Sequence, residues 1–225
     1  MDTDVTETAM FSAQTTSGTP TGGTDRGPRA IVVMGVAGSG KTTVAALLAG
    51  RLGASFAEGD DFHSPANVAK MAAGHPLDDD DRWPWLHGIR DWFAKELAEG
   101  RSAVVPCSAL RRSYRDLLET AGTSTTGSDT AGTDSTGSAS TGSASTGTVQ
   151  FVHLTGSYDL LRTRIQGRAG HFMKPEMLDG QLEALEPLQD DEPGFAVDIT
   201  QRPDQIVEEI LRLLDGAART ESEDR

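Results

Sequence analysis

The sequence predicts a single α/β domain in which helices cover both faces of a parallel β-sheet. Three observations predict this fold class. Short apolar runs of strand length recur along the 225-residue chain, amphipathic helical stretches separate them, and the first run leads directly into a glycine-rich turn. Strands that alternate with helices favour a parallel sheet, because each connecting helix packs back onto a sheet face.

The chain begins with a segment unlike a folded core. Residues 1–28 are rich in Thr, Ser and Gly and lack the apolar stretch of a signal peptide. We expect a disordered tail there, because such a composition buries too little apolar surface to offset its ordering entropy. The first expected strand follows at residues 30–34, within a single domain expected over residues 29–216.

A complete GxxxxGK[ST] phosphate-binding loop follows the first strand. Its residues are Gly35, Val36, Ala37, Gly38, Ser39, Gly40, Lys41 and Thr42. The glycines let successive backbone N–H groups turn toward a polyphosphate, and the helix that follows adds the positive end of its dipole. In this motif the lysine reaches the β- and γ-phosphates, and the threonine hydroxyl binds Mg²⁺. A glycine turn that binds nothing would not explain a Lys-Thr pair at this offset.

The second expected strand, residues 54–57, leads into a cluster of carboxylates. Glu58, Asp60 and Asp61 would emerge at the same sheet edge as the phosphate loop, followed by His63. A carboxylate there can accept a hydroxyl proton or hold a water on Mg²⁺. These acids could instead end the strand and solvate a turn. We favour a functional role for Asp60 and leave His63 open between the two interpretations.

Helix signals follow. Ser64-Pro65 supplies an N-cap and a proline at N1, and Gly74 a stop. The four acids at residues 78–81 are typical of helix capping, whereas Arg82 after them could bind an anionic substrate. Apolar residues then repeat at helical spacing, which indicates core packing: Trp85, Ile89, Trp92, Phe93 and Leu97.

The third expected strand, residues 103–107, ends in small residues that would let a substrate approach the backbone. Ser108, Arg111, Arg112 and Tyr114 follow it. The arginine and tyrosine side chains could bind a carboxylate or a hydroxyl group. Arg111 and Arg112 cannot both face inward from one helix, so we expect one of them to be solvated.

The rest of the chain holds an insertion, two strands and a basic stretch. Residues 121–148 are nearly all Ser, Thr, Gly and Ala, so we expect a flexible insertion. Expected strands at 149–154 and 195–199 follow, helices open at Lys174-Pro175 and Arg202-Pro203, and a charged tail spans 217–225.

Arginines follow the fourth strand. Arg164 and Arg168 are four residues apart and share a helix face, whereas Arg162 points elsewhere. Two arginines on one face suit a lid that closes on ATP and neutralises charge on the transferring phosphoryl group. The alternative is a solvated basic stripe.

Composition excludes several classes of function. Acidic residues outnumber basic residues by fourteen, which argues against a nucleic-acid partner. The single cysteine, Cys107, excludes an intramolecular disulfide and a multi-cysteine zinc site, and we interpret it as a packing residue. No apolar run approaches membrane-spanning length, so we expect no membrane association and a soluble, cytoplasmic protein.

In combination, these motifs closely resemble the gluconokinase family. The motifs that carry the resemblance are residues 34–41, Gly59-Asp60, Lys70-Met71, Pro76-Leu77, residues 79–82, residues 84–86, residues 107–110, residues 114–116 and residues 170–172. The similarity runs from about residue 30 to residue 214. It implies a P-loop kinase three-layer fold with a five-stranded parallel sheet, a lid segment, and transfer of the γ-phosphoryl group of ATP to the 6-hydroxyl of D-gluconate.

The resemblance also implies roles for individual residues. It assigns ATP and Mg²⁺ to residues 35–42, with Thr42 on the metal. The implied catalytic residues are Lys41, Asp60, Arg164 and Arg168. The implied gluconate contacts are Asp60, Lys70, Arg82, Ser108, Arg112, Tyr114 and His171. Relatives usually carry Asp-Gly-Asp where this chain has Glu58-Gly59-Asp60, which weakens a metal role for Glu58. Relatives are often homodimers.

Two other functions stay open. A small-molecule kinase of the same fold could act on shikimate or a nucleotide. A GTP-dependent switch is the other, more distant alternative. It is considered because residues 191–194 match a DxxG pattern. Guanine recognition through NKxD is not possible, since the only asparagine, Asn67, is followed by Val68.

Overall fold

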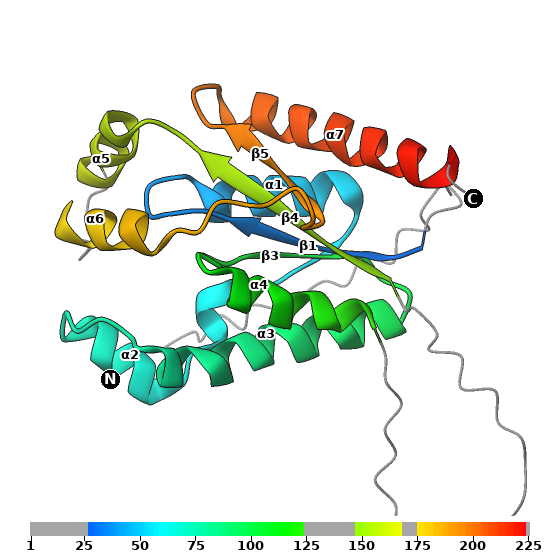
Figure 1. Ribbon diagram of the computed structural model, residues 1–225. Helices are drawn as coiled ribbons and strands as arrows, with labels where there is room; N and C mark the ends of the chain where they lie inside the picture. Colours follow the sequence, from blue (N-terminus) through cyan, green and yellow to red (C-terminus); the bar gives the residue numbers. More distant parts are fainter. Residues whose placement is uncertain (1–26, 124–146, 168–174, 224–225) are drawn as a thin grey trace, which may run out of the picture.

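A computed structural model describes residues 27–123, 147–167 and 175–223, with the backbone alone for 175–177 and 217–223. Its centre is a five-stranded, fully parallel sheet in the order β2-β3-β1-β4-β5 (Figure 1). The strands are β1 (Arg29–Met34), β2 (Ser55–Phe56), β3 (Ala103–Pro106), β4 (Thr148–Thr155) and β5 (Gly194–Asp198). The fold class and all five strands expected from the sequence are confirmed.

Helices cover both faces of this sheet. They are α1 (Lys41–Leu52), α2 (Pro65–Ala72), α3 (Asp79–Ala98), α4 (Arg112–Glu119), α5 (Tyr158–Gln166), α6 (Pro175–Ala184) and α7 (Pro203–Glu223), with 3₁₀ turns η1 (Gly59–Phe62) and η2 (Thr120–Gly122). In Figure 1, α1 and α7 lie on one side of the sheet and α3 and α4 on the other.

Strand β1 shows why both faces must be covered. Ile31 and Val33 belong to the buried cluster beneath α1 and α7, while Val32 and Met34 belong to the cluster beneath α3 and α4. Alternate residues of a strand point to opposite faces, so a strand that is apolar throughout needs a layer on each side. The two clusters form the core.

The chain direction brings the functional segments together. Strand β1 lies between β3 and β4, so the connections leave it toward both sides of the sheet. Ligands of open α/β sheets bind at such a switch point, beyond the carboxyl ends of the strands. The segments that follow β1, β2, β3 and β4 therefore form one edge of the molecule.

The helix boundaries follow the expected signals. The Ser64 hydroxyl accepts the Asn67 N–H at 3.2 Å, with Pro65 at the first helical position. Gly74 has φ of +79°, a left-handed conformation that ends the segment. Asp78 and Asp81 form a capping box, in which each side chain accepts the backbone N–H of the other. The capping interpretation is confirmed for these two acids.

The two segments expected to be disordered were residues 1–28 and 121–148. Most of each, residues 1–26 and 124–146, lies outside the described residues. The ends of the second segment meet, because a Cβ on Gly122 would lie 2.7 Å from the carbonyl oxygen of Gly147. Among the described helices, none has the length and apolar character needed to cross a membrane.

Candidate active site

The phosphate loop is held in a shape that favours glycine at three points. Gly35, Gly38 and Gly40 have φ of +136°, +80° and +91°. A Cβ on Gly35 would lie 2.7 Å from the Leu154 carbonyl oxygen, and one on Gly38 would lie 2.7 Å from that of Leu161. Both contacts are shorter than real Cβ atoms make, so the loop packs directly on the end of β4 and on α5.

The loop ends at a helix terminus suited to an anion. Gly40 is the N-cap of α1, no side chain caps it, and the first turn holds no acidic residue. The first N–H groups of a helix lack intrahelical partners, so here they can bind phosphate oxygens. The Lys41 ammonium group donates to the Val36 carbonyl at 3.1 Å and thus lies along the loop. The site therefore fits the polyphosphate of a nucleotide.

Glu58 contacts the phosphate loop, at the sheet edge where the sequence places it. The Thr42 hydroxyl donates to its carboxylate at 3.2 Å. Burial raises the pKa of Glu58, and the charges of Asp60 and Asp61 raise it further, against the effect of Thr42. A hydroxyl and a carboxylate are oxygen ligands that suit Mg²⁺, which binds few protein groups and completes its shell with phosphate and water.

Asp60 is exposed on η1, between two groups of side chains. Its charge acts on the pKa of Glu58, beside the phosphate loop, and on the pKa of His63. The turn can pack there because Gly59 has no side chain: a Cβ would lie 2.2 Å from the Pro106 carbonyl oxygen. The Trp85 indole N–H donates to the Gly59 carbonyl at 2.6 Å and fixes the turn.

His63 stacks on the indole of Trp85. The ring centroids are 4.4 Å apart and the rings lie nearly parallel. Burial lowers the pKa of His63, and the nearby positive charge of Arg82 lowers it further, so the neutral form is favoured. Its buried Nδ1 has no hydrogen-bond partner within the described part of the chain. His63 thus packs in the wall of the site and does not pair with a carboxylate.

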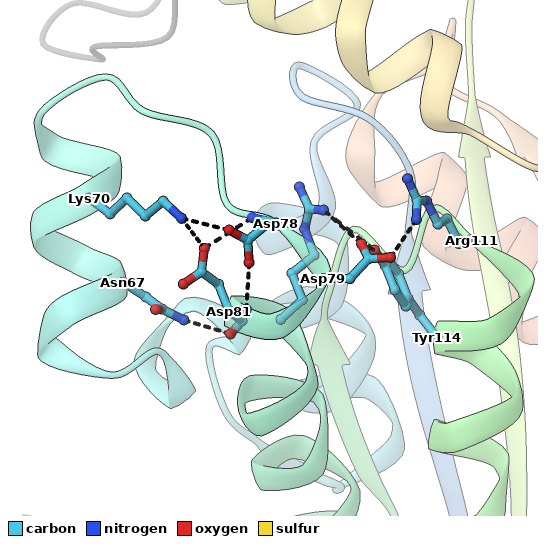
Figure 2. A network of polar contacts seen from close by, with 8 residues as sticks. Asn67, Lys70, Asp78, Asp79, Asp81, Arg111 and Tyr114 are labelled. Carbon is cyan, nitrogen blue, oxygen red and sulfur yellow. Dashed lines mark hydrogen bonds and ion pairs between the residues drawn. The ribbon is translucent and has the colours of Figure 1, made fainter.

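A cluster of four polar side chains is built around the Asp79 carboxylate, which Figure 2 labels together with Arg111 and Tyr114. We name it the arginine pole; it comprises Asp79, Arg82, Arg111 and Tyr114. The Asp79 carboxylate accepts from the Tyr114 hydroxyl at 2.6 Å, from Arg111 at 2.7 Å and from Arg82 at 3.5 Å. These three donors lower the pKa of Asp79. The pole contains two guanidinium groups and one carboxylate, so it can accept one further negative charge.

The structure brings Arg111, and not Arg112, to this pole. Arg111 is the extended N-cap of α4, and its guanidinium group also lies 5.8 Å from the centre of the Tyr114 ring. Arg112 is directed elsewhere and forms two hydrogen bonds of 2.8 Å with Asp191. Arg111 therefore contacts the arginine pole and Arg112 pairs with Asp191, although the two side chains are about equally exposed, at 41% and 40%. The geometry selects the residue that the family resemblance did not.

Lys70 makes contacts other than those implied by the resemblance. Its ammonium group forms ion pairs with Asp78, at 3.0 Å, and with Asp81 (Figure 2). Both acids belong to the capping box, so Lys70 ties α2 to the start of α3. This pairing lies beside the arginine pole and is not part of it.

The end of β3 contacts the phosphate loop through its backbone. The Ser108 carbonyl accepts the Gly35 N–H at 3.4 Å, and the next residue, Ala109, has φ of +42°. A left-handed alanine carries strain that the buried surroundings must maintain. Cys107 is buried, and its burial raises the pKa of the thiol to about 12, which confirms a packing role.

Arg164 lies next to the phosphate loop. It donates to the Ile199 carbonyl at 2.7 Å, and its guanidinium group would lie 4.0 Å from a Cβ on Gly40. A positive charge therefore lies next to the N-terminus of α1. The other expected residues of this segment, Arg168 and His171, lie outside the described residues.

The sequence analysis missed one buried ion pair that supports the site. Arg115 is 1% exposed and donates to both carboxylate oxygens of Glu192, at 2.5 and 3.0 Å. Its guanidinium group also donates to the carbonyls of Ala109, Leu110 and Glu186. The pair thus holds the strained turn after β3. Residues 191–194, which match DxxG, have structural contacts of this kind: Asp191 pairs with Arg112 and Glu192 pairs with Arg115.

Comparison with known proteins places this geometry among P-loop proteins. A protein-family model described as an AAA domain matches residues 31–188. A gluconokinase from Gluconobacter oxydans is 44% identical over 82% of this chain and 90% of its own.

Two solved structures are similar throughout the described fold. A sugar kinase from Janibacter sp. has a TM-score of 0.68 at 40% identity and covers 84% of this chain and 95% of its own. A gluconokinase from Sinorhizobium meliloti has a TM-score of 0.66 at 40% identity, with 87% and 94% covered.

Proposed function

The chain belongs to the gluconokinase family, and from this premise we propose that it transfers the γ-phosphoryl group of ATP to the 6-hydroxyl of D-gluconate. The observation that supports the proposal is the surroundings of Asp60. Its charge acts on the pKa of Glu58, which accepts the Thr42 hydroxyl of the phosphate loop, and on the pKa of His63, on which Arg82 of the arginine pole also acts.

The donor half of the site binds and positions ATP. Backbone N–H groups at the start of α1 contact its phosphates. The Lys41 ammonium group has three donors, so it can keep the Val36 carbonyl and also donate to the β- and γ-phosphates. Arg164 is close enough to the helix terminus to stabilise negative charge that develops during transfer. Arg168 is proposed to assist from the lid.

Thr42 and Glu58 are the residues that would hold Mg²⁺, Glu58 directly or through water. Bound Mg²⁺ supplies charge neutralisation on the phosphate oxygens. Burial raises the pKa of Glu58, and the charges of Asp60 and Asp61 raise it further, so a bound cation would stabilise its ionised form.

The acceptor half binds a polyhydroxy acid with one carboxylate. We assign that carboxylate to Arg82 and Arg111, with Tyr114 between them, because the pole has an excess of one positive charge. Guanidinium groups pair with carboxylates through two parallel hydrogen bonds. Asp60 then orients the acceptor hydroxyl and accepts its proton as the phosphoryl group transfers in line. Ser108 and His171 stay candidates for the remaining hydroxyls.

ATP-dependent ADP release distinguishes this proposal from its rivals. The protein is assayed with D-gluconate, shikimate and a panel of nucleoside monophosphates. The charge of the arginine pole fits shikimate as well as gluconate, so the family relationship is what favours gluconate. ADP release that occurs with gluconate and not with the other acceptors supports the proposal. ADP release with another acceptor but not with gluconate would overturn it.

Location and assembly complete the proposal. A cytoplasmic location is supported by the one cysteine, Cys107, which is buried and carries no disulfide. A homodimer remains a prediction from the family resemblance.

A further inference from the structure

One peptide group of the phosphate loop contacts Lys41 on one side and helix α6 on the other. Its carbonyl, from Val36, accepts the Lys41 ammonium group at 3.1 Å and the Ser39 N–H at 3.3 Å. Its N–H, from Ala37, donates to the Gln181 side-chain oxygen at 2.6 Å. In a trans peptide these two groups point in opposite directions, so whatever fixes the N–H also aims the carbonyl.

The packing of α6 fixes the place of Gln181. Leu178, one turn earlier, is 1% exposed in the cluster that contains Val36 and Ala37, and Leu182 packs against the same cluster. Residues three and four apart share a helix face, so this apolar contact presses the Gln181 face of α6 against the loop. Gln181 is therefore a half-buried acceptor at a defined position.

From these contacts we propose that Gln181 is a positioning residue for Lys41. Its amide oxygen orients the peptide between Val36 and Ala37, and the carbonyl of that peptide in turn holds the lysine ammonium group beside the loop. Without this acceptor the Ala37 N–H, in a residue that is 5% exposed, has no partner and the peptide is free to rotate. The inference rests on the proposed nucleotide site but does not depend on the identity of the acceptor substrate.

The test measures the affinity for ADP by calorimetry in the full-length protein. We expect Gln181→Leu to raise the Kd for ADP about fivefold, the factor that corresponds to ~1 kcal/mol for one neutral hydrogen bond. Gln181→Asn keeps the amide group but moves its oxygen away from the Ala37 N–H by the length of one methylene group. It is the milder variant, and it should also raise the Kd for ADP. Glu183→Leu, an exposed position on the same helix, is the matched control and should leave the Kd unchanged.

A double-mutant cycle separates positioning from simple support of the fold. If Gln181 acts through Lys41, Gln181→Leu should change the Kd for ADP little in a Lys41→Met background. A fivefold change that persists in that background would overturn the proposal, as would an unchanged Kd in both Gln181 variants. Failure of the gluconokinase proposal would look different: the wild-type protein would bind ADP with the same Gln181 dependence but would not phosphorylate gluconate.

Discussion

Asp60 is the proposed base, and its charge acts on the pKa of both Glu58 and His63. Asp60→Asn keeps the size of the side chain but cannot accept a proton from the acceptor hydroxyl. We expect kcat to fall by about 10²–10⁴-fold, the range of general base catalysis. Thermal unfolding should not change, because the side chain is exposed. Near-normal turnover with gluconate would show that Asp60 has another role.

Arg111 and Arg112 provide a matched pair of substitutions. Arg111→Gln removes a cation from the arginine pole, and we expect KM for gluconate to rise about tenfold or more, since hydrogen bonds to charged groups contribute about 1.5–3 kcal/mol. Arg112→Gln breaks the exposed pairs with Asp191 and Asp116 and should leave this KM unchanged. Steady-state kinetics at saturating ATP check both variants. A larger effect for Arg112→Gln would restore the assignment implied by the resemblance.

The choice between these arginines shows where sequence reasoning stops at the residue scale. Adjacent residues of a helix differ by about 100° in direction, so the assignment depends on the residue at which the helix begins. Helix α4 begins at Arg112, which leaves Arg111 outside the helix in an extended conformation. The sequence carries no proline or capping signal at this point, and the boundary could not be predicted to one residue.

Among the elements, those formed by local signals were predictable. The order of strand, glycine loop and helix places residues 35–42 at the end of β1, and the Ser64-Pro65 pair marks the start of α2. Arg115 and Glu192 pair although they are 77 positions apart in the sequence, and no local sequence pattern around either residue predicts the pair. Long-range polar pairs depend on the finished packing, which the local pattern does not contain.

This buried pair yields a prediction on stability. Glu192→Gln leaves the Arg115 charge without its partner, and we expect the free energy of unfolding to fall by about 3–5 kcal/mol. Denaturant titration at neutral pH measures the loss. A decrease below about 1 kcal/mol, the level of an exposed pair, would contradict a structural role for the pair.

The same pair predicts a pH dependence. The Arg115 guanidinium group lowers the pKa of Glu192 below the ordinary value of 4.5. A carboxyl whose folded-state pKa is lowered contributes stability that is fully present above 4.5 and is lost as pH falls through the folded-state pKa. Below pH 4.5 the wild-type protein should therefore lose stability more steeply than Glu192→Gln, and equal slopes in acid would contradict this assignment.

For the whole molecule, the low-complexity segment at residues 124–146 interrupts the kinase domain between α4 and β4. Its ends meet at Gly122 and Gly147, next to the start of β4. We expect that a short glycine-serine link in place of residues 124–146 preserves both kcat and the thermal unfolding midpoint, because loop-closure entropy changes only slowly with length. Parallel assays of the full-length and shortened proteins check this. Loss of turnover in a shortened protein that remains folded would assign the insertion a role in catalysis.

Most of the overall architecture could be predicted, because alternating strands and helices leave few topologies for a parallel sheet. The composition of the acceptor half could be predicted only through family resemblance. Lys70 illustrates the limit: it lies in a shared motif, yet its ammonium group pairs with two acids of the α3 capping box. Roles for Arg168 and His171 stay predictions.

The central claim concerns the acceptor, so the most direct measurement is ³¹P NMR of the protein with MgATP and D-gluconate. The account predicts one new phosphomonoester signal, coupled to the C6 protons of gluconate, which grows in step with ADP. ADP that forms at the same rate without gluconate, or a phosphomonoester that forms only with shikimate or a nucleoside monophosphate, would contradict it.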